Sequence, residues 1–246
     1  MKLNRICFLD AATFGVDYDF SDLSQLAPLT VYSHTDKQDT LERIRGFDIV
    51  ITNKVVLNEA VLSKATELKL ICVAATGTNN VDLQFAESRG IQVCNAVGYS
   101  THSVAQHCMA LCLELMHRNR QRNQDCLRNW SKSKVFSLVG SQFDELNSKR
   151  WGILGLGSIG SQVAQLASAF GSEVVYHSVS GNSFHSDYLA VSFEELLRTS
   201  DVLSIHTSLR SETKHLFGHQ EFALMKPDVV FLNMARGQIC EPRALI

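Results

Sequence analysis

Residues 151–160 read WGILGLGSIG, a short apolar run that leads directly into the pattern G-x-G-x-x-G. A helix-like segment, residues 161–170, follows. In such a strand-turn-helix unit, Gly155 permits the tight turn, Gly157 lets a phosphate approach the backbone, and Gly160 allows helix and strand to pack closely. The stretch therefore predicts a turn that binds the pyrophosphate of a dinucleotide at the free N–H groups of the helix. An isolated match also occurs for purely conformational reasons, so the flanking sequence decides.

The residues after this turn alternate between strand-like and helix-like patterns. Strand-like apolar runs occur at 151–155, 173–177, 201–206 and 228–234. A dinucleotide-binding sheet usually has about six strands, and four or five can be drawn here before residue 246. The last residues, 242–246, begin with proline and read as the first turn of a helix. We therefore expect a Rossmann domain that is incomplete at its C-terminus.

The first part of the chain shows the same alternation. Asp39, Asn58 and Asp82 each precede a helical pattern and are candidate N-caps. Repeated alternation predicts a parallel sheet with helices on both faces, so residues 1–98 form one α/β unit. The expected strands of this unit are Ile6–Leu9, Leu29–Tyr32, Asp48–Ile51, Lys69–Val73 and Ile91–Val93.

Between the two units, residues 103–117 carry an apolar stripe with a helical period. A polar stretch, residues 118–133, follows it. We expect a long helix at a domain junction and then an exposed arm. The apolar stripe suits a helix that pairs two subunits, and a helix buried within its own chain would look the same.

Composition excludes several classes of function. The chain has 246 residues, 45% of them hydrophobic, and a formal charge of −2, so it offers no basic field for nucleic acid or an anionic membrane. Its apolar runs are too short to span a bilayer, and its opening residues do not read as a secretory signal. Seven cysteines without a C-x-x-C pair indicate reduced thiols and a cytoplasmic protein. His107, Cys108 and Cys112 lie in an apolar run, so we expect core packing rather than a metal site.

Four motifs together resemble one family, the D-isomer-specific 2-hydroxyacid dehydrogenases. They are ATGTNNVD at residues 75–82, the segment 98–107 with GYST and SVAQH, the glycine turn, and NMARG at 233–237. Within the family, the chain looks most like the bacterial hydroxypyruvate reductases, also called glycerate dehydrogenases. The resemblance implies a flavodoxin-like substrate-binding domain at 1–98, without its usual C-terminal return helix. It also implies an NAD(P)-binding Rossmann domain at 99–246, in which 99–150 form the linking helix and a possible dimerisation arm.

The resemblance also implies a reaction, the reduction of a 2-keto acid such as hydroxypyruvate or glyoxylate. Arg236 matches the catalytic arginine of the family, whose forked guanidinium can hold the substrate carboxylate and polarise the keto oxygen. The plainer alternative is a surface arginine that follows a strand. The backbone amides of Thr76 and Gly77 match the turn that binds the substrate carboxylate in the family, and a simple strand-to-helix turn is the alternative there.

Coenzyme contacts follow from the same resemblance. Besides the three glycines of the turn, the matching positions are Ser158 and Ile159 at the pyrophosphate, and Thr207, Met234, Ala235 and Arg236 along the ribose and nicotinamide. His206 ends an apolar run, and we expect a hydrogen-bonded structural group there rather than a catalytic base.

Coenzyme choice depends on the residue that follows the second strand of the dinucleotide fold. An acid that binds the adenosine ribose usually lies about 20 residues past the glycines. Ser178 occupies that place here, so no carboxylate repels a 2′-phosphate. Residues 174–197 contain no Lys or Arg that could bind one. NAD is therefore the expected coenzyme, with NADP as the open alternative.

The sequence departs from the family pattern after Arg236. Family members carry a glutamate and an acid-base histidine further on, and the sequence ends ten residues after Arg236 without either. Glu241 stands where the family has an aspartate. Loss of a positioned general acid costs about a hundredfold to ten-thousandfold in rate, so impaired turnover is expected. Two readings remain open beside the enzyme: a non-catalytic nucleotide-binding or homodimeric protein, and a chain that does not fold stably.

Overall fold

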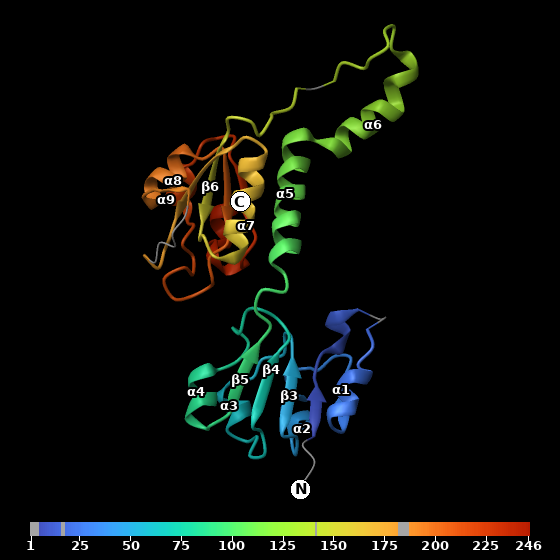
Figure 1. Cartoon of the computed structure of the whole chain (residues 1–246), viewed down its shortest axis with the longest axis vertical. Helices are drawn as coiled ribbons and strands as arrows, with labels where there is room; N and C mark the ends of the chain where they lie inside the picture. The colour runs from blue at the N-terminus through green and yellow to red at the C-terminus, as the bar shows by residue number, and fades with distance from the viewer. Residues whose placement is uncertain (1–4, 16–17, 141, 182–186) are drawn as a thin grey trace. The chain divides into compact units, whose positions relative to one another are not determined.

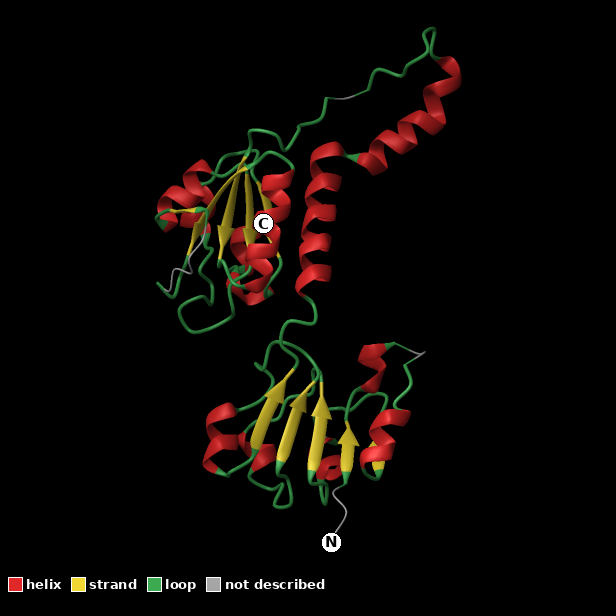
Figure 2. Cartoon of the chain, viewed as in Figure 1, coloured by secondary structure: helices red, strands yellow, loops and turns green. Residues whose placement is uncertain are grey.

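The computed structural model describes residues 5–15, 18–140, 142–181 and 187–246 (Figure 1). The chain folds into two compact units, Met1–Tyr99 and Ser100–Ile246. Each unit is built on its own parallel sheet with helices beside it (Figure 2). The α/β class predicted from the alternating apolar runs is therefore confirmed in both units.

Short apolar runs form the sheet of the first unit. Its strands within the described residues are β1 (Ile6–Phe8), β2 (Leu29–Val31), β3 (Ile49–Thr52), β4 (Leu70–Val73) and β5 (Gln92–Asn95). They are parallel and lie in the order β2-β1-β3-β4-β5. This is the order of flavodoxin-like folds, so the predicted strands and the predicted fold of this unit are confirmed.

The helices of the first unit are short. They are η1 (Ala11–Phe14), α1 (Ser21–Leu26), α2 (Thr40–Ile44), α3 (Glu59–Leu62) and α4 (Leu83–Ser88). Two of the predicted N-caps are confirmed, because Asn58 accepts from the Val61 N–H at 3.2 Å and Asp82 accepts from the Phe85 N–H at 3.1 Å. The prediction for Asp39 was wrong: its side chain makes no cap hydrogen bond. Its backbone is helical (φ −90°, ψ −14°), whereas a capping residue needs an extended one.

The sheet of the first unit is covered on both faces. Val50, Ile71 and Val73 belong to one buried cluster, and Ile6, Phe8 and Ile51 belong to another. Because successive side chains of a strand point to opposite faces, this division follows directly from the strand sequences. Polar residues follow the apolar strands and lie in loops at the carboxyl edge of the sheet.

The second unit has a sheet of a different order. Its strands within the described residues are β6 (Arg150–Leu154), β7 (Glu173–His177), β8 (Leu189–Ala190), β9 (Val202–Ile205) and β10 (Val230–Asn233). They are parallel in the order β10-β9-β6-β7-β8. With β6 counted as the first strand, this is the Rossmann order 3-2-1-4-5 read from the other edge. The Rossmann fold predicted for this half of the chain is confirmed.

Helices and turns of the second unit cover both faces of its sheet. They are α5 (Thr101–His117), α6 (Asn119–Asn129), η2 (Trp130–Lys132), α7 (Ser158–Ala169), α8 (Phe193–Thr199), α9 (His219–Leu224), η3 (Gly237–Ile239) and η4 (Pro242–Leu245). The helical turn predicted after Pro242 is present as η4.

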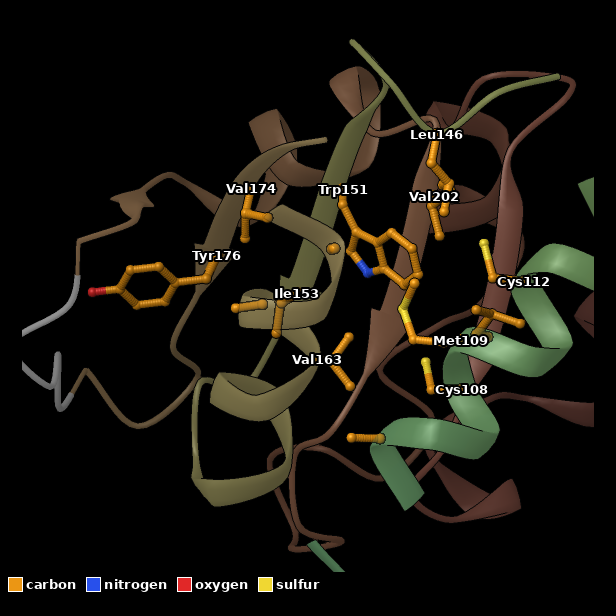
Figure 3. Close-up of a cluster of buried hydrophobic side chains, with 14 of the residues drawn as sticks. Cys108, Met109, Cys112, Leu146, Trp151, Ile153, Val163, Val174, Tyr176 and Val202 are labelled. Carbon is orange, nitrogen blue, oxygen red and sulfur yellow. The ribbon is translucent and has the colours of Figure 1, made fainter. Parts of the chain in front are cut away.

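The apolar stripe of α5 is buried inside its own unit. Cys108, Met109 and Cys112 of α5 pack with Trp151 of β6 and Val163 of α7 in one cluster (Figure 3). Burial raises the pKa of both Cys108 and Cys112 to about 12, so both thiols are protonated at pH 7, as suits the predicted core role. Packing within the chain therefore accounts for the buried part of the stripe.

Most of the polar stretch after α5, which was expected to be an exposed arm, forms a second helix. Arg118 has a left-handed backbone (φ 52°) that ends α5, and α6 begins at the next residue. None of the residues of α6 is buried. The sequence did not predict this helix, because a helix that buries no face has no apolar period.

Candidate functional site

Two glycines of the 155–160 turn are required by the fold itself. Gly155 has φ +93°, a left-handed conformation, and a Cβ there would lie 3.0 Å from the backbone nitrogen of Thr207. A Cβ on Gly160 would lie 2.2 Å from the carbonyl oxygen of Gly155. Neither position accepts a side chain without movement of backbone. Both glycines therefore allow α7 and β9 to approach the end of β6 closely.

The third glycine has no such explanation. Gly157 has φ −82°, which any residue adopts, and a Cβ there would meet nothing within 4 Å. It is the N-cap of α7 and supplies no side-chain hydrogen bond, so the first N–H groups of α7, at Ser158 and Ile159, have no cap of this kind. Bare N–H groups beside open space at the start of a twelve-residue helix fit an anion such as a pyrophosphate.

A cavity of about 490 Å³ opens beside this turn. Ligand pockets commonly have such volumes, about 300–1,000 Å³. Of the positions predicted to contact coenzyme, Gly155, Gly157, Ser178 and Thr207 line it. Ser158, Ile159 and Gly160 lie in the first turn of α7 next to it, and Met234, Ala235 and Arg236 are not among its lining residues. The structure thus brings the end of β7 and the loop after β9 to the glycine turn.

A slightly larger cavity, about 570 Å³, lies at the edge of the first unit. It is lined by residues of α4 and β5, among them Leu83, Glu87 and Val93. None of the motif residues lines it, and it faces the edge strand of the sheet rather than the ends of the strands. We therefore take the cavity at the glycine turn as the functional one.

His206, the residue after β9, lines the cavity at the glycine turn. Among the described residues, neither ring nitrogen has a hydrogen-bond partner. The prediction that His206 is hydrogen-bonded is therefore wrong. Burial lowers the pKa of the imidazole to about 4, so the ring is neutral at pH 7 and is a poor proton acceptor. This agrees with the expectation that His206 is not a catalytic base.

The lowered pKa of His206 makes the fold sensitive to acid. The unfolded chain binds a proton at His206 near pH 6.5, while the folded chain does so only near pH 4. Between these values the unfolded state binds more protons, so stability is lost as the pH falls. We expect His206 to account for about 2 kcal/mol of the loss between pH 7 and pH 4.5.

Chemical unfolding at a series of pH values measures this effect. His206→Gln should flatten the dependence of the unfolding free energy on pH over this range. His219→Gln, which changes an exposed histidine of the same unit, should keep the slope of the unsubstituted protein. Equal slopes in all three proteins would contradict the assignment.

At the carboxyl end of β10, Asn233 shapes the turn that carries Arg236. Its side-chain oxygen accepts from the Ala235 N–H at 3.1 Å, and its side-chain nitrogen donates to the Arg236 carbonyl at 2.9 Å. The exposed Arg236 guanidinium donates to the Ala235 carbonyl at 3.0 Å. Met234 packs against the cluster beneath α5, and Ala235 packs on the other face of the sheet. Asn233 thus fixes the backbone from which Arg236 projects, a role that sequence alone did not reveal.

In the first unit, Thr76 and Gly77 lie in the loop that follows β4. Asn95 at the end of β5 donates from its side chain to the Thr76 carbonyl at 2.6 Å, and the Thr76 hydroxyl donates to the Ala96 carbonyl at 3.0 Å. The loop is therefore held to the neighbouring strand by side-chain hydrogen bonds as well as by backbone ones. Such a fixed loop is suited to presenting backbone amides.

Asp10 holds a second loop at the same edge of this sheet. The residue is 3% exposed and lies just after β1, with Leu9 between them. Its carboxylate accepts from the backbone N–H groups of Asn53 at 2.9 Å, Lys54 at 2.6 Å and Val55 at 3.3 Å. The signal was present in the sequence, since an acid that follows a buried strand without a basic neighbour needs such donors.

Comparison with known proteins agrees with this geometry. Residues 109–246 match the model of the NAD-binding domain of the D-isomer-specific 2-hydroxyacid dehydrogenases. The chain belongs to this dehydrogenase family. A hydroxypyruvate reductase of Blautia hydrogenotrophica is 33% identical to it over 236 residues, which are 94% of this chain and 73% of that protein.

Solved structures show the same fold over nearly the whole dehydrogenase chain. An acyclic imino acid reductase in complex with NADPH and D-Arg has a TM-score of 0.87 and 25% identity, and the match covers 98% of this chain and 77% of the other. The D-lactate dehydrogenase from Aquifex aeolicus, complexed with NAD and lactic acid, has a TM-score of 0.84 and 30% identity, with 98% and 72% covered. The predicted family and its NAD(P) coenzyme are thus confirmed.

Among the residues that the structure describes, no helix is both long and apolar enough to cross a bilayer.

Proposed function

We propose that this dehydrogenase binds NAD(P)H at the glycine turn and reduces a small 2-keto acid, hydroxypyruvate or glyoxylate, to the 2-hydroxy acid. The observation that carries the proposal is the open space at Gly157, at the bare N-terminus of α7. Folding requires glycine at 155 and 160 but not at 157, so a ligand that needs the space explains the third glycine. The hydroxypyruvate reductase among the similar proteins supports the substrate class.

The coenzyme supplies a hydride and the protein supplies charge and orientation. The amides of Ser158 and Ile159 are suited to the pyrophosphate, while Thr207, Met234 and Ala235 are suited to the ribose and nicotinamide. Hydride transfer to the keto carbon makes the keto oxygen an anion, which a nearby cation stabilises until a water molecule protonates it. Arg236 meets that need, because a guanidinium can donate to the keto oxygen and to the substrate carboxylate together.

The first unit is proposed to bind the substrate carboxylate. Backbone N–H groups of Thr76 and Gly77 can donate to it, in a loop that Asn95 and the Thr76 hydroxyl hold in place. In this division of work, residues 1–98 bind the substrate and residues 99–246 bind the coenzyme.

Two measurements on the 246-residue chain test the proposal. Fluorescence titration should detect binding of NADH or NADPH, and the decrease in absorbance of the reduced coenzyme should report reduction of hydroxypyruvate or glyoxylate. Failure of a folded sample to bind either coenzyme would refute the proposal. Binding without any turnover would refute the enzymatic part and leave a nucleotide-binding protein.

We also propose that two copies of the chain associate through the segment that follows α5. Helix α6 buries none of its residues, and large apolar side chains on it and after it are exposed, among them Leu127, Trp130, Phe136 and Val139. Their exposed fractions are 81% for Leu127, 58% for Trp130, 96% for Phe136 and 89% for Val139. Exposed apolar side chains gathered in one segment are typical of an interaction surface.

Sedimentation velocity tests this association. The unsubstituted chain should sediment as a dimer, and Leu127→Glu with Phe136→Glu should shift it to monomer, because two carboxylates would be buried in the contact. Leu26→Glu changes another exposed leucine, in α1 of the first unit, and should leave the dimer intact. A monomeric unsubstituted chain at micromolar concentration would rule the proposal out.

Free thiols support a reducing compartment. All seven cysteines are unpaired in the structure. A chain with seven free thiols suits the cytoplasm better than an oxidising compartment. We therefore keep the cytoplasm as the proposed location.

A further inference from the structure

The coenzyme cavity has an unusual charge pattern at the end of β7. In Rossmann folds that bind NAD, a carboxylate after this strand accepts hydrogen bonds from the adenosine ribose, and it repels a 2′-phosphate. Here the chain leaves β7 as Ser178-Val179-Ser180, and all three residues line the cavity. The feature that normally excludes a 2′-phosphate is therefore replaced by hydroxyl groups.

The two serines form a pair of hydroxyls. The Ser178 and Ser180 side-chain oxygens lie 3.3 Å apart, and either can donate to the other. Ser178 is half-buried and Ser180 is exposed, so the pair stands at the rim of the cavity. Neighbouring hydroxyls of this kind can donate together to the oxygens of one phosphate.

A cation reaches the same cavity from another strand. Arg210 lies in the loop after β9 and lines the cavity together with the two serines. Sequence spacing did not predict it, because Arg210 lies far from Ser178 along the chain. Among the described residues, the Arg210 guanidinium forms no ion pair, although the side chain is exposed.

The backbone at Arg210 is fixed by a buried side chain. Thr213 is 2% exposed, and its hydroxyl oxygen accepts from the Arg210 N–H at 2.7 Å. The same hydroxyl donates to the Ser208 carbonyl at 2.7 Å. The loop therefore presents Arg210 from a constrained position rather than from a free tail, which lowers the entropic cost of using it in binding.

One carboxylate opposes this arrangement. Glu212 also lines the cavity, and its pKa is lowered by hydrogen bonds from its own backbone N–H and from the Ser211 hydroxyl and by the nearby positive charge of Arg210, so it is ionised at pH 7. The carboxylate is fully exposed, and solvent screens its repulsion of a phosphate. Arg210, by contrast, can form charge-assisted hydrogen bonds with a phosphate directly.

We propose that this cavity selects NADPH over NADH, with Arg210, Ser178 and Ser180 binding the 2′-phosphate of the adenosine ribose. The inference rests on the proposed coenzyme site and narrows its ligand. It assigns coenzyme selectivity to one residue from the loop after β9 and two from the end of β7. NADP thus replaces NAD as the expected coenzyme.

Direct binding tests the selectivity without requiring turnover. Calorimetric titrations at fixed salt should show NADPH binding at least about tenfold more tightly than NADH, because charge-assisted hydrogen bonds to a phosphate are strong. Adenosine 2′,5′-bisphosphate should likewise bind more tightly than 5′-AMP. Equal or tighter binding of NADH would overturn the proposal. Failure of both coenzymes to bind would instead refute the coenzyme site itself.

Substitutions locate the effect. Arg210→Gln should weaken NADPH binding by about tenfold and leave NADH binding within about twofold, while Ser178→Asp should reverse the preference by repelling the 2′-phosphate. Arg198→Gln, which changes an arginine of α8 that pairs with Glu194, should alter neither affinity. Equal weakening of both coenzymes by Arg210→Gln would show that Arg210 does not bind the 2′-phosphate.

Discussion

Arg236→Gln should lower kcat/KM for hydroxypyruvate by about a thousandfold, equivalent to about 4 kcal/mol of transition-state stabilisation. Glutamine keeps a hydrogen-bond donor, but its side chain is shorter and lacks the charge and the forked pair of N–H groups. The keto oxygen becomes anionic only during hydride transfer, so most of the loss should appear in kcat. Steady-state rates, measured from the decrease in coenzyme absorbance, give the result.

Two further readouts keep this expectation testable at any level of turnover. Oxamate carries the same carboxylate as the substrate, and its affinity for the complex with coenzyme should fall by at least about tenfold in Arg236→Gln. Coenzyme affinity itself should change little. Arg243→Gln, which alters an exposed arginine seven residues further on, is the matched control and should resemble the unsubstituted protein. Near-normal rates and oxamate binding in Arg236→Gln would remove Arg236 from the proposed mechanism.

The sheets could be predicted because their strands are buried on both faces. A parallel strand covered on both sides reads as a continuous apolar run, as at Ile49–Thr52 and Val202–Ile205. The exception is β8, Leu189–Ala190, which has two residues, both exposed at the edge of the sheet. A strand so short and exposed leaves no apolar run in the sequence, so it was missed.

Motif spacing located the glycine turn that is proposed to bind the pyrophosphate, but not the residues that support the site. The glycines lie close together in sequence, and their roles depend on local geometry. Arg210 and Asn233 act through tertiary structure instead: one reaches the cavity from a different strand, and the other hydrogen-bonds around its own turn. Since parallel strands bring their carboxyl ends to one edge, such residues become neighbours only when the strand order is known.

The sequence also could not predict whether a buried side chain finds a hydrogen-bond partner. His206 ends an apolar strand, and hydrogen bonding of such a group is the usual outcome. The structure instead leaves both ring nitrogens without a partner among the described residues, on the wall of the cavity. Whether a buried group finds a partner depends on atoms from several elements, which periodicity does not describe.

Alanine substitutions at two glycines of the turn should affect different properties, stability at Gly160 and coenzyme binding at Gly157. Gly160→Ala should destabilise the second unit by about 3 kcal/mol or more, because its Cβ would overlap the Gly155 carbonyl oxygen, and overpacking of this kind is costly. A drop of about 6–12 °C in the Tm is the corresponding shift. Gly157→Ala should leave the Tm within about 1 °C, since its Cβ meets nothing within 4 Å. It should weaken NADPH binding by at least about tenfold, because the methyl group occupies the place of a phosphate.

Gly140→Ala is the matched control, since a Cβ there also meets nothing within 4 Å but the residue lies outside the turn. It should change neither the Tm nor the affinity, and calorimetry of melting and of binding measures both quantities on the same samples. Unchanged NADPH affinity in a well-folded Gly157→Ala protein would mean that the space beside α7 receives no phosphate, and the coenzyme site would then have to lie elsewhere. A stable Gly160→Ala protein would mean that β6 and α7 can separate without cost, which the close contact of Gly160 with Gly155 argues against. The two substitutions therefore separate what folding requires of the turn from what the ligand requires of it.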